Sequence, residues 1–401
     1  LCASCLLLAA ALENADSKKK PSSSPSQPAP GRKLELKPFG VDVVTHASTI
    51  VKAVPSTAIF LVMNQILRNL KAKYKLTAIP HALVGMFLVL GGLIGIGEEK
   101  AAKVVSFMKP SVDLLTQFLP SFFIPALVVS PLPLSNMVLA DSLKFFLISA
   151  LAIPWVYLWT GNMVEFLQRL QGAPRPVKST VKVSAPTTFT PIFSESLEKL
   201  YTAAVVGLGT AAHFRPGWAT HAFYCAATLY SFIFANRIPR FFHPAARRFV
   251  HPLVISFAWL SLVFGVFGAF QKQSLFQVLR HYLVAGGPPL SAGGNFILFW
   301  LEPCIITFAF GLYDRRRLLF DNALPILGGS TTAGIIGILS IALLGRAIGA
   351  SDEVKLALLP RGTAALAVVQ AAAIGANQAL TAVNCCFVGI FGANFGIFML
   401  D

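Results

Sequence analysis

Long, almost uncharged runs of apolar residues recur from residue 48 to the end of the chain. Each is close to the roughly 20 residues that an α-helix needs to cross a bilayer. They lie near 48–67, 79–97, 111–131, 143–161, 198–213, 218–235, 250–270, 296–312, 323–345, 355–374 and 380–399. The runs are too long and too continuously apolar for the alternating strands of a membrane barrel. The sequence therefore predicts an all-α polytopic membrane protein with about eleven transmembrane helices.

Charge and cysteine patterns narrow the class of protein. Charged residues make up 12% of the chain, whereas soluble domains carry about a quarter. The net charge of +16 gathers in short loops such as 315–317, which favours a membrane surface over nucleic acid as the partner. The six cysteines have no metal-binding or disulfide-framework spacing, so we expect neither a metal nor a cofactor. Catalytic signatures such as GxSxG in strand-to-helix context are missing, and we do not expect an enzyme.

Composition divides the chain into four parts. Residues 1–40 combine a short apolar run with "SKKKPSSSPSQPAPGRKL", which is typical of a two-part plastid targeting leader or of an unstructured terminus. Residues 41–161 form a first membrane module, and the polar, proline-rich stretch 162–196 reads as a linker. Residues 197–401 form the second module.

Proline and glycine interrupt several of the apolar runs in the second module. The interruptions are Pro360 to Gly362, Pro303 after Glu302, Pro325 with Gly328 and Gly329, and Gly286 to Gly294. A broken backbone at membrane depth is tolerated where protein or water satisfies it, and transporters use such half-helices to meet anions. We therefore predict discontinuous helices in this module, with 323–345 and 355–374 interrupted or tilted. The alternative for any single break is an ordinary kink.

Six segments carry a resemblance to a known family. "FFHPAARRFVHPLVISFAWL", "GGNFILFWLEPCIITFAFGLYDRRRLL", "ALLPRGTAALAVVQ" and "ALTAVNCCFVGIFGANF" occur in that order in the second module. They resemble the LrgB/CidB family. "TAIPHALVGMFLVL" and "LLTQFLPSFFIPALVV" in the first module are similar to LrgA signatures. The chain thus looks like the plant form of the family, which fuses the two modules. The family pattern continues beyond Asp401, so we expect the second module to be truncated.

This resemblance implies a secondary transporter of glycolate and glycerate in the plastid inner envelope, acting in photorespiration. Two alternatives remain open. Bacterial relatives are attributed a holin-like role, which implies an oligomeric, membrane-permeabilising or regulatory assembly. The second alternative is a carrier of the same fold for another small organic anion, such as pyruvate.

Arg361 is the strongest candidate for contact with the substrate. It stands between Pro360 and Gly362 in a broken run, and a guanidinium binds a carboxylate through two parallel hydrogen bonds. Thr363 would add a hydroxyl for the 2-hydroxyl group. Alternatively, Arg361 ends a loop and extends to the membrane interface as an anchor.

Four further polar residues lie in or beside apolar runs. Asn295 and Asn394 are candidates to line the pathway, although an amide there equally serves as a helix cap or as a contact between helices. Glu302 and His251 are candidates to carry a coupling proton, because an intramembrane carboxyl and an imidazole both titrate readily. His251 precedes Pro252, so a capping role is its alternative.

Overall fold

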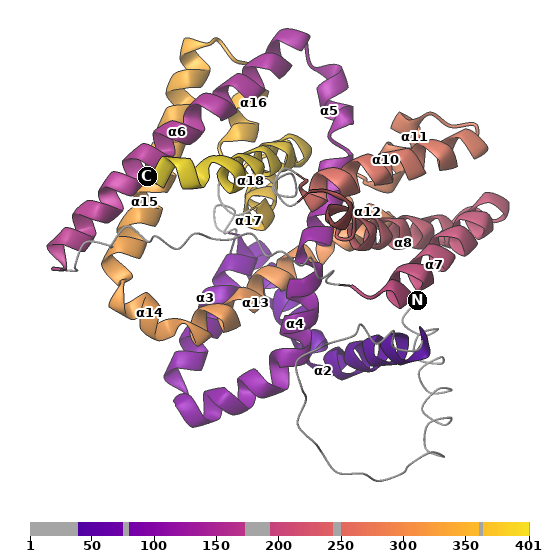
Figure 1. The fold of residues 1–401 in the computed structure, drawn as a ribbon, viewed down its shortest axis with the longest axis horizontal. Coiled ribbons are helices and arrows are strands. Elements are labelled where there is room, and N and C mark those ends of the chain that lie inside the picture. The colour runs from indigo at the N-terminus through magenta and orange to yellow at the C-terminus, as the bar shows by residue number, and fades with distance from the viewer. Residues whose placement is uncertain (1–38, 75–79, 173–192, 244–249, 361–363, 401) are drawn as a thin grey trace.

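Helices and their connections make up the described part of the chain, with no strand among residues 39–74, 80–172, 193–243, 250–360 and 364–400 of this computed structural model (Figure 1). The predicted leader lies almost wholly outside the described residues, as do the middle of the linker, the triplet Arg361 to Thr363 and the terminal Asp401. The expectation of an all-helical protein is confirmed.

The first half of the chain forms α2 (Phe39–Lys73), α3 (His81–Gly95), α4 (Glu98–Val128), α5 (Pro131–Asn136), α6 (Leu139–Leu170), α7 (Glu195–Phe214) and α8 (Trp218–Ala235). The second half forms the 3-10 turn η1 (Ile238–Phe241), α10 (Pro252–Phe270), α11 (Leu275–Tyr282), α12 (Gly293–Phe299), α13 (Leu301–Asp314), α14 (Arg316–Asp321), α15 (Ala323–Ala347), α16 (Asp352–Leu358), α17 (Ala364–Ala373) and α18 (Gln378–Leu400).

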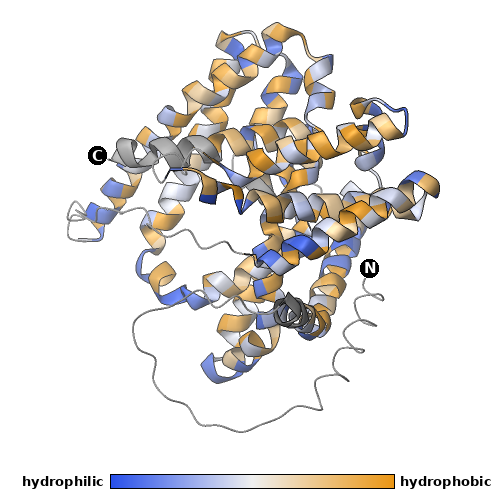
Figure 2. Cartoon of the chain, turned by 45° about the vertical axis from the view of Figure 1, so that its right-hand side comes forward, coloured by the Kyte–Doolittle hydropathy of each residue, from blue (hydrophilic) through white to orange (hydrophobic). Residues whose placement is uncertain are grey.

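Six helical stretches among the described residues are long and apolar enough to cross a membrane. They are Thr45–Lys73, Glu98–Asn136, Leu139–Leu170, Pro252–Phe270, Gly293–Asp314 and Ala323–Ala347. Each predicted apolar run falls on one or two helices, but the count of about eleven spans is not confirmed. α3 is one reason, since its 15 residues are fewer than a bilayer requires. Apolar side chains dominate the long helices, and polar ones gather near helix ends (Figure 2).

α4 lies at the centre of the molecule and connects the two predicted modules (Figure 1). Residues 121–130, which include Phe122 and Phe123, are all buried. α4 packs against α2 and α3 from the first module and against α8, α10, α12, α13, α17 and α18 from the second. α6 belongs to the first predicted module but packs most extensively against α15 of the second. The predicted modules therefore interlock, and their separation into two bundles is not confirmed. α6 also extends to Leu170, into the predicted linker.

α15 is an unbroken helix of 25 residues, so 323–345 is not interrupted, and the alternative that it is tilted stays a prediction. Pro325 is its third residue, and proline is tolerated in a first turn because the missing N–H has no partner there. Gly328 and Gly329 allow close approach of α6, because a Cβ on either would lie within 2.6 Å of Leu167 or Val164. These glycines serve packing. The run 355–374, by contrast, is divided between α16 and α17.

Candidate functional site

A proline determines where the span Gly293–Asp314 is interrupted. α12 ends at Phe299, Trp300 adopts φ −67° and ψ −13°, and α13 begins at Leu301. Pro303 has no N–H to donate to the carbonyl of Phe299 four residues earlier. The break therefore falls before Pro303, which occupies the first turn of α13. Glu302 is the second residue of that turn, near the middle of the span.

Glu302 meets three side chains from α2 and α3, and we call Asn64, Arg68, His81 and Glu302 the junction cluster. Asn64 Nδ2 donates to Glu302 Oε2 at 3.1 Å. Arg68 Nε lies 3.0 Å from the same oxygen, and His81 Nε2 lies 3.2 Å from it. The cluster joins the first module to the second through one carboxylate oxygen.

The junction cluster is largely withdrawn from solvent. The exposed fractions of the side chains are 15% for Glu302, 9% for His81 and 35% for Arg68, and Asn64 is 1% exposed. The guanidinium of Arg68 also lies over the ring of Phe299, 5.3 Å from its centroid. Charged groups inside a membrane span are costly, so they pair with one another and typically mark substrate or ion pathways. This is the arrangement expected of a functional site.

A cavity of about 790 Å³ lies between α3, α4 and α13, the last of which carries Glu302, and none of the four junction-cluster residues lines it. Leu83 and Ile305 line it, and these residues follow His81 and Glu302 by two and three positions. Its polar lining consists of Lys109, Asp113, Thr116, Thr307, Asp314 and Arg315. Small-molecule sites typically measure 300–1,000 Å³ with a few polar groups on an apolar wall. The cavity thus offers cations for a carboxylate and acceptors for a hydroxyl.

A second cavity, of about 380 Å³, lies beside the break between α16 and α17. Tyr157, Ser330 and Gln370 contribute its polar lining, and Leu359 borders it next to the break. Pro360 is buried. The candidates Arg361, Gly362 and Thr363 lie outside the described residues, so their part in this cavity stays a prediction.

Asn295 is engaged by the loop that precedes α12. Its Oδ1 accepts from Val284 N at 2.8 Å, and its Nδ2 donates to Val284 O at 2.9 Å and Gly287 O at 3.2 Å. Both amide donors are used, and the residue is 8% exposed. Asn295 therefore braces the backbone that leads into the span.

His251 is the N-cap of α10, where its Nδ1 accepts a hydrogen bond from Leu253 N at 3.3 Å. Burial lowers the pKa of His251 below its ordinary value. The capping contact uses the neutral imidazole, because a protonated ring has no acceptor. Asn394 lies on α18, and its side chain is outside the described part. Asn384, ten residues earlier, accepts from Ser149 of α6 at 2.8 Å, which is a contact between helices.

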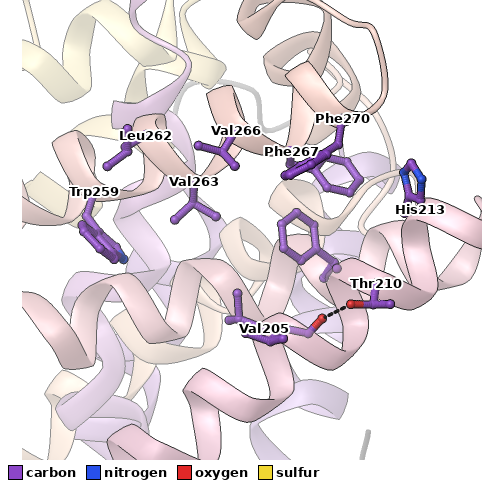
Figure 3. Close-up of a pocket in the computed structure, with 12 residues that line it drawn as sticks. Val205, Thr210, His213, Trp259, Leu262, Val263, Val266, Phe267 and Phe270 are labelled. Carbon is purple, nitrogen blue, oxygen red and sulfur yellow. Dashed lines mark hydrogen bonds between the residues drawn. The ribbon is translucent and has the colours of Figure 1, made fainter.

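The groove between α7, α8 and α10 does not suit an anion (Figure 3). It measures about 500 Å³, and its lining includes Val205, Trp259, Val263 and Phe270 but no lysine or arginine. His213 stands at one end, near Phe270 (Figure 3). Such a surface favours apolar groups.

Three members of the junction cluster were not expected to be functional from the sequence. Arg68 directly follows the predicted apolar run 48–67, where a basic residue indicates a loop at the membrane surface, and nothing in the hydropathy pattern singles out Asn64 or His81. A usable signal was present in the spacing of Asn64 and Arg68, because residues four apart share one face of a helix. An amide and a guanidinium on one face of a membrane helix require a partner, but its identity depends on the tertiary structure.

Comparison with known proteins agrees with the resemblance described above. Over 339 residues, or 80% of its length, the chain is 26% identical to the plastidal glycolate/glycerate translocator 1, chloroplastic, of Arabidopsis thaliana. The aligned part covers 63% of that relative, so the chain spans less than two thirds of its length. No solved structure matches the chain. The model of the LrgB-like family matches from Thr228 onward, through α10 to α18 and the Glu302 side of the junction cluster. Residues 228–401 are therefore similar to the LrgB-like family.

Proposed function

We propose that the chain is a secondary transporter of small organic anions, with the 2-hydroxy carboxylates glycolate and glycerate as its first candidate substrates. The name of the Arabidopsis relative and the match to the LrgB-like family support this class. Because the chain covers 63% of that relative, the assignment of the same substrates to this chain is part of the proposal. They share one carboxylate and a neighbouring hydroxyl.

The observation that carries the proposal is the junction cluster, with the cavity between α3, α4 and α13 as a second supporting feature. Arg68 supplies a permanent positive charge, and Lys109 and Arg315 add further cations along the cavity wall. Alternating access requires a site between helices that move relative to one another, and the junction cluster lies between α2, α3 and α13. Glu302 remains the candidate for a coupling proton, since its oxygen lies 3.2 Å from His81 Nε2. Arg361 and Thr363 would add a second contact point at the divided α16–α17 segment.

The proposed location is the plastid inner envelope, and the proposed role is in photorespiration. The relative is chloroplastic by name, and the composition of residues 1–40 suits a plastid leader. A fusion of this leader, completed with a start methionine, to a fluorescent protein should label plastids. A secreted or diffuse cytosolic signal would contradict the assignment.

Uptake and leakage in the same proteoliposomes test the transport class. Saturable uptake of labelled glycolate without release of an entrapped dye supports a carrier. Dye release without saturation selects the holin-like alternative and refutes the proposal. Competition by unlabelled glycerate and pyruvate then ranks the substrates, and stronger inhibition by pyruvate would transfer the assignment to another organic anion.

A further inference from the structure

We propose that the junction cluster recognises the substrate itself, with Arg68 binding the carboxylate and Asn64 accepting a hydrogen bond from the 2-hydroxyl group. The inference rests on the proposed transport function and names the residues that give it specificity. It makes Asn64 the residue that distinguishes a hydroxy acid from a plain carboxylate.

Asn64 presents an acceptor that the described residues leave unused. A carboxylate oxygen accepts only, so the contact with Glu302 fixes Nδ2 toward that oxygen and turns Oδ1 away. Oδ1 is buried and has no hydrogen-bond partner among the described residues, and the whole residue is 1% exposed. A buried polar atom without a partner costs free energy. A hydroxyl from a ligand would supply the missing donor.

Arg68 retains the two terminal amino groups that suit a carboxylate. Its Nε is the atom that pairs with Glu302, and no described residue accepts from the terminal groups. The side chain is 35% exposed, so an incoming anion reaches it. The ring of Phe299 beneath the guanidinium restrains its orientation. Two parallel N–H groups in a fixed plane bind a carboxylate through both oxygens.

The spacing of the two residues matches the ligand. Asn64 and Arg68 are one helical turn apart on the same face of α2, which places their Cβ atoms about 5–6 Å from each other. In a 2-hydroxy acid the hydroxyl is on the carbon next to the carboxylate, so one small molecule reaches both side chains. Oδ1 is covered in this structure. The hydroxyl therefore reaches it when a helix that covers Oδ1 moves while the contact between Asn64 and Glu302 is kept, as one step of alternating access.

The test compares glycolate with acetate, which lacks only the hydroxyl. The full chain in proteoliposomes is assayed for inhibition of labelled glycolate uptake by each unlabelled acid. Asn64→Leu should reduce the preference for glycolate over acetate by roughly two- to ten-fold, the worth of one neutral hydrogen bond. The apparent affinity for acetate should stay unchanged. Asn69→Leu is the matched control, because Asn69 is exposed on the same helix and its side chain bonds only to Gln65 among the described residues.

Three outcomes overturn the inference. The first is an unchanged glycolate-to-acetate preference in inserted Asn64→Leu protein, which is expected if Oδ1 contacts only water. The second is an equal loss of affinity for both acids in that variant. The third is the same change of preference in Asn69→Leu. If Asn64→Leu does not insert, Asn64→Ala provides the same comparison. Failure of the proposed function appears in the wild type as a lack of saturable uptake. Failure of this inference appears only in the variants.

Discussion

Replacement of Glu302 by glutamine should destabilise the contact between α13 and α2 by about 1–2 kcal/mol. Losing one partner of a fully buried ion pair costs about 3–5 kcal/mol, and an exposed pair is worth about 0–1 kcal/mol. Glu302 is 15% exposed and Arg68 is 35% exposed, so solvent screens the pair and the expected value lies between these limits. The glutamine oxygen still accepts from Asn64, which confines the change mainly to the charge.

A double-mutant cycle isolates this pair. Glu302→Gln, Arg68→Gln and the double variant are unfolded by titration with a denaturing detergent, and the unfolding free energies are compared. We expect a coupling of about 1–2 kcal/mol between the two positions. Glu99→Gln with Lys103→Gln is the matched control, since that pair is at least 75% exposed and should show no measurable coupling. A coupling for Glu302 and Arg68 as small as the control would refute the assignment of an interlocking ion pair.

Three further predictions test other parts of the structure. Gly293→Ala should destabilise the protein by about 1–3 kcal/mol, because a Cβ there would lie 2.7 Å from the backbone of α8. Gly311→Ala is the control: a Cβ there has open space, so the free energy of unfolding in the same assay should not fall. His251 has a pKa in the folded protein below its value in the unfolded chain. Its contribution to stability should therefore be complete above about pH 6.5 and be lost as the pH falls through the lowered pKa. His251→Asn, which retains a capping oxygen, should remove this part of the pH dependence of thermal unfolding. Arg361→Gln should raise the half-saturation concentration for glycolate uptake about 30-fold or more, which corresponds to a loss of ~2–5 kcal/mol of binding free energy. Arg361→Lys should restore the affinity only in part. An unchanged half-saturation concentration in both variants, normalised to inserted protein, would remove Arg361 from the substrate site.

Glu302 and Asn295 illustrate how far the candidate site was predictable. The sequence placed both in or beside one apolar run with Pro303 near its middle, and α12 and α13 follow that run with a break at Trp300. Their partners were not predictable. Asn295 binds a loop eight to eleven residues away, and Glu302 binds residues more than 200 positions away. Contacts of that separation depend on how the helices pack, which hydropathy alone does not specify.

The proline and glycine signals show the same division. Pro303 and Pro325 both occupy the first turn of a helix, and in each case the preceding helix, α12 or α14, ends four residues before the proline. Proline lacks the N–H that would continue the preceding helix, so this local signal is readable from the sequence. Gly328 and Gly329, which suggested weakness in the sequence, lie against α6, and this neighbour gives them a packing role.

The sequence by itself determined that the chain is helical and membrane-spanning, because long apolar runs without charge can satisfy their backbone groups in a bilayer only as helices. It also located the apolar runs that became α8, α10 and α15, whose bounds agree with the predicted ones within two residues, since charge, proline and glycine act locally. Only the tertiary structure decided that α4 unites the two predicted modules, that α6 packs against α15, and that Arg68 and Glu302 meet. These choices depend on the shapes of facing helix surfaces and on the need of each buried polar group for a partner, and the partner here comes from a distant part of the chain.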